Sequence, residues 1–297
     1  MPLTTTDLSR RRKTLLAAGG VAVVAAVGVT VGVLVTGDGE DDGPTNAASC
    51  SDVEFIGVAG SGQRDGGVSA EDAVDAESTD GAEATDAPST GIVSEVGSIV
   101  ADTYTNLEAD LPEDTSINLR AVDYPAMSVP LSLKKETWQE YFGSVAQGMT
   151  ATEETINGTV EECPLSKVVV VGYSQGAMAA RRALLDLGPV DNIVAGVLIG
   201  DGDKLPDDQV STISDYGTDD YRGISQMAKS EWNIDSGGSD EPLPAEWESR
   251  ILSACRDGDV VCALDSFNLG SILDDISAHI NYDAEDWRGF LAEKVAG

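Results

Sequence analysis

The hydrophobic positions of this chain form short, nearly continuous apolar runs separated by stretches of helical spacing. Runs rich in β-branched residues predict five strands, at residues 53–59, 116–122, 168–171, 192–199 and 250–255. Continuous apolar runs of this kind are typical of parallel strands that are buried on both faces. We therefore expect these strands to form the centre of the fold.

Segments with a helical period lie between and after these strands. Apolar residues recur at helical spacing over residues 92–107, a long amphipathic helix is expected at about 135–161, and a final helix at 283–295. A further helix follows the third strand and should stop at Gly188, because Pro189 comes next. This alternation predicts an α/β fold with a central, mainly parallel, five-stranded sheet flanked by helices.

The first 49 residues have the layout of an export segment followed by a linker. Residues 1–14 form a basic region, 15–36 are apolar and nearly uncharged, and 37–49 are acidic and polar. Positive charge before an apolar run and negative charge after it is typical of a segment whose N-terminus stays in the cytoplasm. The run is long for a signal peptide and just long enough to span a bilayer. A cleaved signal peptide and a single-pass membrane anchor both remain open.

Residues 50–297 should form one domain that contains two irregular segments. Residues 65–89 are acidic, have low complexity and lack apolar periodicity, so we expect a solvated surface loop. Residues 204–249 combine several aromatic residues with many polar ones. This insertion either covers part of a site or only packs on the domain.

The chain has 297 residues and a formal net charge of −34, with 18 Lys and Arg against 52 Asp and Glu. Such an excess of negative charge argues against a nucleic-acid partner and disfavours contact with anionic membranes. It is typical of a solvated acidic surface, and we expect a monomer. Four cysteines beyond an export segment suggest two disulfides. The spacing of Cys and His residues gives no zinc motif, so we expect neither a metal nor an organic cofactor.

The strongest candidate for chemistry is the turn that follows the third strand. Gly172-Tyr173-Ser174-Gln175-Gly176 fits the G-x-S-x-G nucleophile elbow, in which a strained serine sits between a strand and a helix. The hydroxyl of Ser174 would project above the sheet, and the backbone N–H of Gln175 would point to the same side to stabilise an oxyanion. The alternative is a glycine-rich turn with an inactive serine.

A serine nucleophile needs a base, and the chain contains a single histidine, His279. His279 follows Ser174 in the chain, as expected for a triad in the order Ser, Asp or Glu, His. After the first strand, Gly60-Ser61-Gly62 forms a tight loop in which Ser61 is a second candidate oxyanion donor. By itself this loop also fits an ordinary strand-to-helix turn.

Several separate segments together resemble the cutinase family of serine esterases, within the α/β-hydrolases. They are the segments 53–63, 122–126 (VDYPA), 172–177 (GYSQGA), 255–262 (CRDGDVVC) and the H-x-x-Y of His279 and Tyr282. The resemblance extends from about Cys50 to the C-terminus and implies a three-layer α/β-hydrolase. The family usually carries Arg where this chain has Ala59. We therefore expect weaker anchoring of the loop that carries Ser61.

The resemblance also implies roles for individual residues. Ser174, Asp259 and His279 would form the triad, and Ser61 with Gln175 the oxyanion hole. Asp257, Asp265, Asp274 and Asp275 compete with Asp259, which is favoured because it follows a strand within a disulfide-closed loop. The family pattern pairs Cys255 with Cys262 and leaves Cys50 with Cys163.

These features predict an exported serine esterase that is secreted or held at the extracellular face of the cell membrane. Its substrate would be a short or medium acyl ester, or a polyester such as cutin. A lipase, phospholipase or thioesterase acting on longer acyl chains is the alternative within the same enzyme class. A non-catalytic cell-surface protein that retains the hydrolase fold is the alternative of another class.

Overall fold

Six parallel strands form the central sheet in the computed structural model, which describes residues 45–64, 91–130, 134–216, 220–264 and 272–297. The predicted basic region 1–14, apolar segment 15–36 and acidic loop 65–89 lie outside the described residues, as does most of the linker 37–49. Among the described residues, none of the helices combines the length and the apolar character that a membrane crossing requires.

The strands run in the order β2-β1-β3-β4-β6-β5, and every neighbouring pair is parallel. Their bounds are β1 Val53–Val58, β2 Ile117–Ala121, β3 Lys167–Tyr173, β4 Ile193–Ile199, β5 Ser211–Thr212 and β6 Ile251–Ala254. The five predicted strands are all present, but the strand count was too low by one. β5 was missed because it has two residues, both polar, and so carries no hydrophobic pattern.

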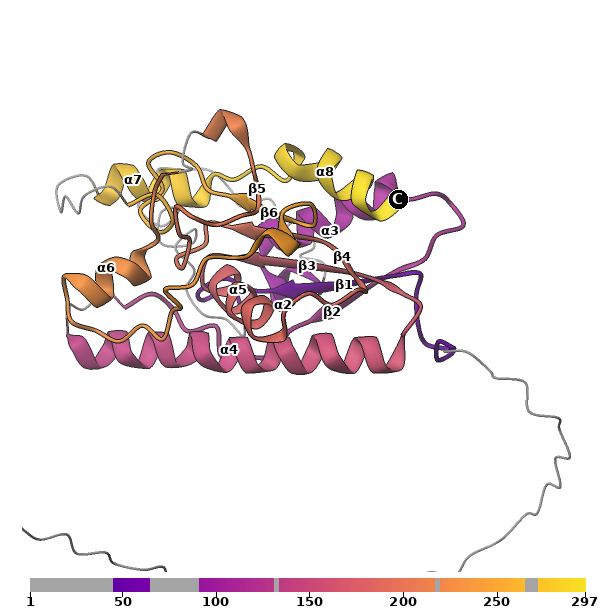
Figure 1. Ribbon diagram of the computed structural model, residues 1–297, viewed down its shortest axis with the longest axis horizontal. Helices are drawn as coiled ribbons and strands as arrows, with labels where there is room; N and C mark the ends of the chain where they lie inside the picture. The colour runs from indigo at the N-terminus through magenta and orange to yellow at the C-terminus, as the bar shows by residue number, and fades with distance from the viewer. Residues whose placement is uncertain (1–44, 65–90, 131–133, 217–219, 265–271) are drawn as a thin grey trace, which may run out of the picture. The chain divides into compact units, whose positions relative to one another are not determined.

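Helices cover both faces of the sheet, as the α/β prediction requires. Figure 1 shows α4 along one side of the sheet, with α5 between them, and α3 and α8 on the opposite side. The helices are α2 Val93–Val96, α3 Ser98–Asp110, α4 Lys135–Glu162, α5 Gln175–Leu187, α6 Ile224–Ser230, α7 Ile272–Ile280 and α8 Glu285–Ala296. The predicted helix at 92–107 is broken at Gly97, whose φ of 82° leaves the helical region.

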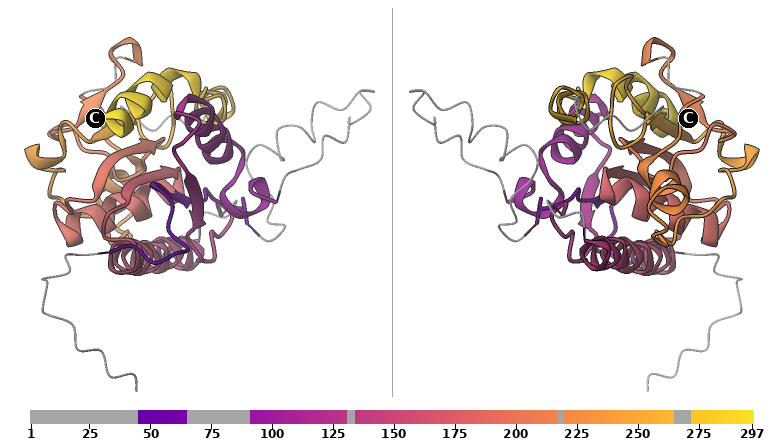
Figure 2. Two further views of the ribbon diagram at one scale, coloured as in Figure 1. Left: turned by 90° about the vertical axis from the view of Figure 1, so that its right-hand side faces the viewer. Right: turned by 90° about the vertical axis from the view of Figure 1, so that its left-hand side faces the viewer.

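The strand residues alternate between two separate hydrophobic clusters, one on each side of the sheet. Figure 2 shows the corresponding arrangement of the backbone, with helices on either side of the sheet. One cluster joins Phe55 and Val171 to α3 and to Trp287 of α8. The other joins Ile56 and Val170 to α4 and α5. Burying both faces explains why the strands read as continuous apolar runs.

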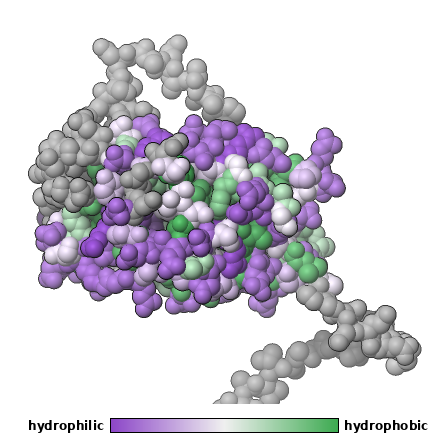
Figure 3. Space-filling view, turned by 45° about the horizontal axis from the view of Figure 1, so that its top comes forward, coloured by the Kyte–Doolittle hydropathy of each residue, from purple (hydrophilic) through white to green (hydrophobic). Residues whose placement is uncertain are grey.

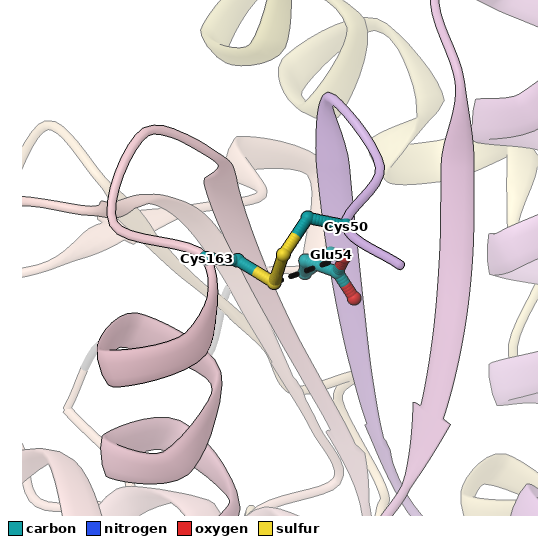
Figure 4. A group of neighbouring side chains, drawn as sticks. All are labelled: Cys50, Glu54 and Cys163. Carbon is teal, nitrogen blue, oxygen red and sulfur yellow. Dashed lines mark hydrogen bonds between the residues drawn. A yellow bond between two sulfur atoms is a disulfide. The ribbon is translucent and has the colours of Figure 1, made fainter. Parts of the chain in front are cut away.

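A disulfide between Cys50 and Cys163 fastens the chain before β1 to the end of α4. Figure 4 shows the bridge beside the carboxylate of Glu54, which is fully buried. That carboxylate accepts hydrogen bonds from the Ser51 amide at 2.8 Å and from the Arg120 guanidinium at 2.6 Å. The two sulfur atoms are bonded to each other, so Cys50 and Cys163 beside Glu54 do not offer thiolate ligands to a metal.

The carboxyl ends of the parallel strands meet at one edge of the sheet, where ligands bind in open α/β folds. Residues that follow β1, β3, β4 and β6 lie there: Ser61, Ser174, Gly200 and the loop that contains Asp259. Hydrophilic residues predominate on the face shown in Figure 3, consistent with the strongly acidic composition.

Candidate active site

Ser174 lies at a sharp turn between β3 and α5, as the elbow motif predicted. Its φ of 54° is in the left-handed region, which is unusual for a residue with a side chain. A Cβ on Gly172 would lie 2.5 Å from the Gly176 carbonyl oxygen, and a Cβ on Gly176 would lie 2.2 Å from the Val58 carbonyl oxygen. Only glycine fits at both positions, so the two glycines permit this strained turn.

The side chains of Ser174, His279 and Asp259 form a continuous chain of hydrogen bonds. Nε2 of His279 lies 2.9 Å from Oγ of Ser174, and Nδ1 lies 2.9 Å and 3.0 Å from the two carboxylate oxygens of Asp259. The serine and histidine are each 4% exposed, and the carboxylate is fully buried. This is the arrangement in which a histidine can take a proton from a serine while a carboxylate holds its ring.

His279 comes from the last turn of α7, and Tyr173 and Gly200 fix the position of its ring. The Tyr173 ring stacks on the imidazole at a centroid distance of 5.1 Å, and its hydroxyl donates to the His279 carbonyl oxygen at 3.0 Å. On another side, a Cβ on Gly200 would lie 2.7 Å from Cε1 of the imidazole. The ring is therefore held between a tyrosine face and a glycine backbone.

Asp259 follows β6 in a loop closed by the Cys255–Cys262 disulfide, the pairing that the family resemblance implied. Gly258 has a φ of 80°, which supplies the tight turn before the carboxylate. Burial acts to raise the pKa of Asp259, but the His279 partner and hydrogen bonds outweigh it, so the pKa is lowered. The carboxylate therefore stays charged.

Among the competing carboxylates, Asp257 is exposed, and the imidazole Nδ1 bonds to Asp259 instead. Asp265 and the side chains of Asp274 and Asp275 lie outside the described residues. The hydroxyl of Tyr282 donates to Oδ2 of Asp259 at 2.6 Å. The sequence singled out this tyrosine only as part of a motif. Its contact with the carboxylate depends on a loop separated from it by more than twenty residues, which no local pattern reveals.

Ser61 and Gln175, the predicted oxyanion residues, lie on the same edge of the sheet. The N-terminus of α5 is packed against the end of β1, because Gly176 approaches the Val58 and Ala59 carbonyl oxygens. Gln175 is fully buried and Ser61 is 8% exposed. The Ser61 loop and the backbone N–H of Gln175 therefore lie at the edge of the sheet that also carries the Ser174 turn.

The loop that carries Ser61 is anchored although Ala59 replaces the usual arginine. Arg64 supplies a guanidinium from the other end of the loop, donating to the Val122 carbonyl oxygen at 2.5 Å and pairing with Asp123 at 3.1 Å. The Gly62 amide donates to the Ala126 carbonyl oxygen at 2.7 Å. These contacts tie the loop to the segment after β2. Arg64 therefore compensates for the arginine that is absent at position 59.

Two adjacent buried arginines of α5 hold the start of the insertion 204–249. Arg181 pairs with Asp208 at 2.5 Å and Asp201 at 3.4 Å, and Arg182 pairs with Asp203 at 2.6 Å. Arg182 also donates to the Ser236 carbonyl oxygen at 2.9 Å. These contacts hold the described part of the insertion against the domain.

Comparisons with known proteins all point to one family of esterases. The cutinase family model matches residues 76–294. Cutinase cut1 of Trichoderma harzianum is 34% identical over 100 residues, which are 33% of this chain and 36% of that protein. Acetylxylan esterase 2 of Talaromyces purpureogenus is 41% identical over 56 residues, covering 19% and 23% of the two chains.

A longer match is Carboxylesterase Culp1 of Mycobacterium tuberculosis, 25% identical over 169 residues, with 56% of this chain and 58% of that protein covered. The chain thus spans less than two thirds of the length of the curated relatives it matches. Among solved structures, a novel cutinase-like protein from Cryptococcus sp. superposes with a TM-score of 0.50 at 17% identity. That likeness covers 85% of this chain and 99% of the other, and it supports the fold.

Proposed function

Because the chain belongs to the cutinase family, we propose that it is an exported serine esterase that hydrolyses carboxylic esters. In this proposal residues 50–297 are the catalytic domain and residues 15–36 serve as a signal peptide or membrane anchor. The enzyme would be secreted or held at the extracellular face of the membrane. Two disulfides support this, because such bridges form and persist in oxidising compartments.

The observation that carries the proposal is the 2.9 Å contact between Oγ of Ser174 and Nε2 of His279. Ser174 attacks the ester carbonyl carbon while His279 accepts the hydroxyl proton, and Asp259 stabilises the resulting imidazolium. Donors from Ser61 and Gln175 bind the oxyanion of the tetrahedral intermediate. The alcohol leaves with the proton from His279. A water molecule then attacks the acyl-enzyme while His279 accepts its proton, and His279 returns that proton to Ser174 as the acid is released.

For the substrate we propose short or medium acyl esters or a cutin-like polyester. Relatives named cutinase, acetylxylan esterase and carboxylesterase are all named for ester hydrolysis, which supports the ester class. The net charge of −34 opposes binding to anionic lipid interfaces, so long-chain lipids are the less favoured substrates. Rates on p-nitrophenyl esters of increasing acyl length test this, since a maximum at long chains would favour a lipase.

Ser174→Ala tests the reaction itself. We expect the variant to fold with its native circular dichroism, to lose ester turnover, and to lose labelling by an alkyl phosphonate. Ser94→Ala is the control, because this exposed serine of α2 donates to the nearby Gly91 carbonyl oxygen. Wild-type protein that neither turns over esters nor forms a phosphonate adduct would instead support a non-catalytic surface protein.

A further inference from the structure

The hydroxyl of Tyr141 contacts both of the residues assigned to the oxyanion hole. Tyr141 lies in α4, is 4% exposed, and its hydroxyl is 3.2 Å from Oγ of Ser61. Burial raises the pKa of this hydroxyl, and the side chain of Gln175 acts on it to lower that pKa, as a donor directed at the phenol oxygen would. A residue 80 positions along the chain from Ser61 thus joins the two halves of the oxyanion site.

The backbone of Met127 fixes the orientation of the Gln175 amide. The Met127 N–H donates to Oγ of Ser144 at 3.2 Å, and the Ser144 hydroxyl donates to Oε1 of Gln175 at 3.3 Å. Nε2 of Gln175 donates to the Met127 carbonyl oxygen at 3.3 Å. A backbone amide only donates and a carbonyl only accepts, so each bond in this ring has one direction.

This orientation determines how the Tyr141 proton is used. The second N–H of the Gln175 amide is available to donate to the tyrosine oxygen, which leaves the phenol proton directed to Oγ of Ser61. Burial raises the pKa of Tyr141, so the phenol keeps that proton at neutral pH. With its oxygen accepting from Tyr141, the Ser61 hydroxyl has its own proton free to donate elsewhere.

We propose that Tyr141 is a positioning residue that orients the Ser61 hydroxyl toward the oxyanion of the tetrahedral intermediate. The inference rests on the proposed esterase function of Ser174. A serine hydroxyl can rotate, and an unheld one would spend part of its time bonded to other acceptors. Holding its oxygen from behind preorganises the donor for the transition state, where oxyanion stabilisation acts. Such an interaction raises kcat with little effect on KM.

Tyr141→Phe removes the hydroxyl and keeps the ring, which packs on Trp138 at 5.6 Å and Phe142 at 5.4 Å. We expect kcat for a p-nitrophenyl ester to fall by about tenfold at nearly constant KM, a fraction of the 10²–10³ expected when an oxyanion donor is removed outright. The rate of phosphonate labelling should fall by a similar factor. Tyr104→Phe is the matched control, since this buried tyrosine packs on Phe55 in the cluster on the other side of the sheet.

A double-mutant cycle with Ser61→Ala separates positioning from a general structural effect. If Tyr141 acts through Ser61, the Tyr141→Phe change should lower kcat by less than about twofold in the Ser61→Ala background. An equal decrease in both backgrounds, or an unchanged kcat in the single variant, overturns the inference. Wild-type protein without Ser174-dependent turnover or labelling would refute the proposed function as well, and the inference with it.

Discussion

Tyr282 donates its hydroxyl proton to Oδ2 of Asp259 at 2.6 Å, on the carboxylate that also faces the His279 ring. The backbone amide of Val261 donates to Oδ1 of the same carboxylate at 2.7 Å. These bonds fix the orientation of the carboxylate before any substrate arrives. The Arg256 amide in turn donates to the Tyr282 oxygen at 3.0 Å, so the tyrosine proton is directed to the carboxylate.

Tyr282→Phe should lower both the acid tolerance of the fold and the proposed esterase activity. Because the hydrogen bond from Tyr282 contributes to the lowered pKa of Asp259, its removal raises that pKa. A carboxyl group whose pKa is lower in the folded state than in the unfolded state stabilises the fold at pH values above its unfolded pKa. This stabilisation is lost as the pH falls through the folded-state pKa. Acid unfolding followed by tryptophan fluorescence should therefore begin at higher pH in the variant, and kcat should fall about tenfold. Tyr104→Phe is the control, and an equal pH midpoint of acid unfolding in the two variants would contradict this prediction.

Gly200→Ala should displace the imidazole, because the new Cβ would lie 2.7 Å from Cε1 of His279. Gly188→Ala is the matched control: Gly188 has a similar φ of 65°, against 59° for Gly200, but its Cβ would meet nothing within 4 Å. Both variants should lose roughly 1–2 kcal/mol of stability from backbone strain. Only Gly200→Ala should also lose kcat, by on the order of 10². Equal activities in the two variants would show that the contact does not matter.

The two disulfides should differ in what their removal changes. Cys50–Cys163 spans 113 residues and Cys255–Cys262 spans 7, so chain entropy predicts losses of about 5 and about 2 kcal/mol respectively. The paired Cys→Ala variant of the short bridge should show the larger decrease in kcat, because that bridge closes the loop around Asp259. Urea unfolding and ester turnover of both paired variants measure the contrast. A larger stability loss for the short bridge would contradict the entropic account.

Asp201 should make stability decrease as the pH rises toward neutrality. Burial, opposed by Arg181 and reinforced by Asp203, raises the pKa of Asp201 to about 7. A carboxyl group whose pKa is raised by folding contributes its full stabilisation at pH values below its ordinary pKa near 4. This contribution is lost as the pH rises through the folded-state pKa of about 7. Between pH 4 and pH 8 the wild type should therefore lose on the order of 2–4 kcal/mol more than Asp201→Asn. Urea midpoints at several pH values measure this, with exposed Asp191→Asn as the control.

Much of the fold and the candidate site followed from local sequence patterns. Buried parallel strands read as apolar runs, and the glycines around Ser174 fit a turn that excludes a Cβ at either position. Chain order and the single histidine directed attention to His279, which the structure brings within hydrogen-bonding distance of Ser174. These features were predictable because the constraint acts on residues close together in sequence or on a unique residue.

Contacts between residues far apart in the chain were not predictable in this way. Arg64 compensates for Ala59 from the far end of its loop, and Tyr141 reaches Ser61 from a helix 80 residues later. Side chains of these types are common on surfaces, so only the folded geometry distinguishes them. The two-residue strand β5 was missed for a related reason, since its pairing with β6 rather than its own residues defines it.

Arg181 and Arg182 pair with the aspartates that follow β4, and these ion pairs limit how this part of the protein can move. These guanidinium groups couple the segment around Asp203 to the helix that begins beside the nucleophile. Swinging that segment outward would strip two buried cations of their counterions, so it is ill suited to act as a hinged cover. Variants meant to reshape this region should therefore keep the contacts of Arg181 with Asp208 and of Arg182 with Asp203, because loosening them would leave buried charges unpaired.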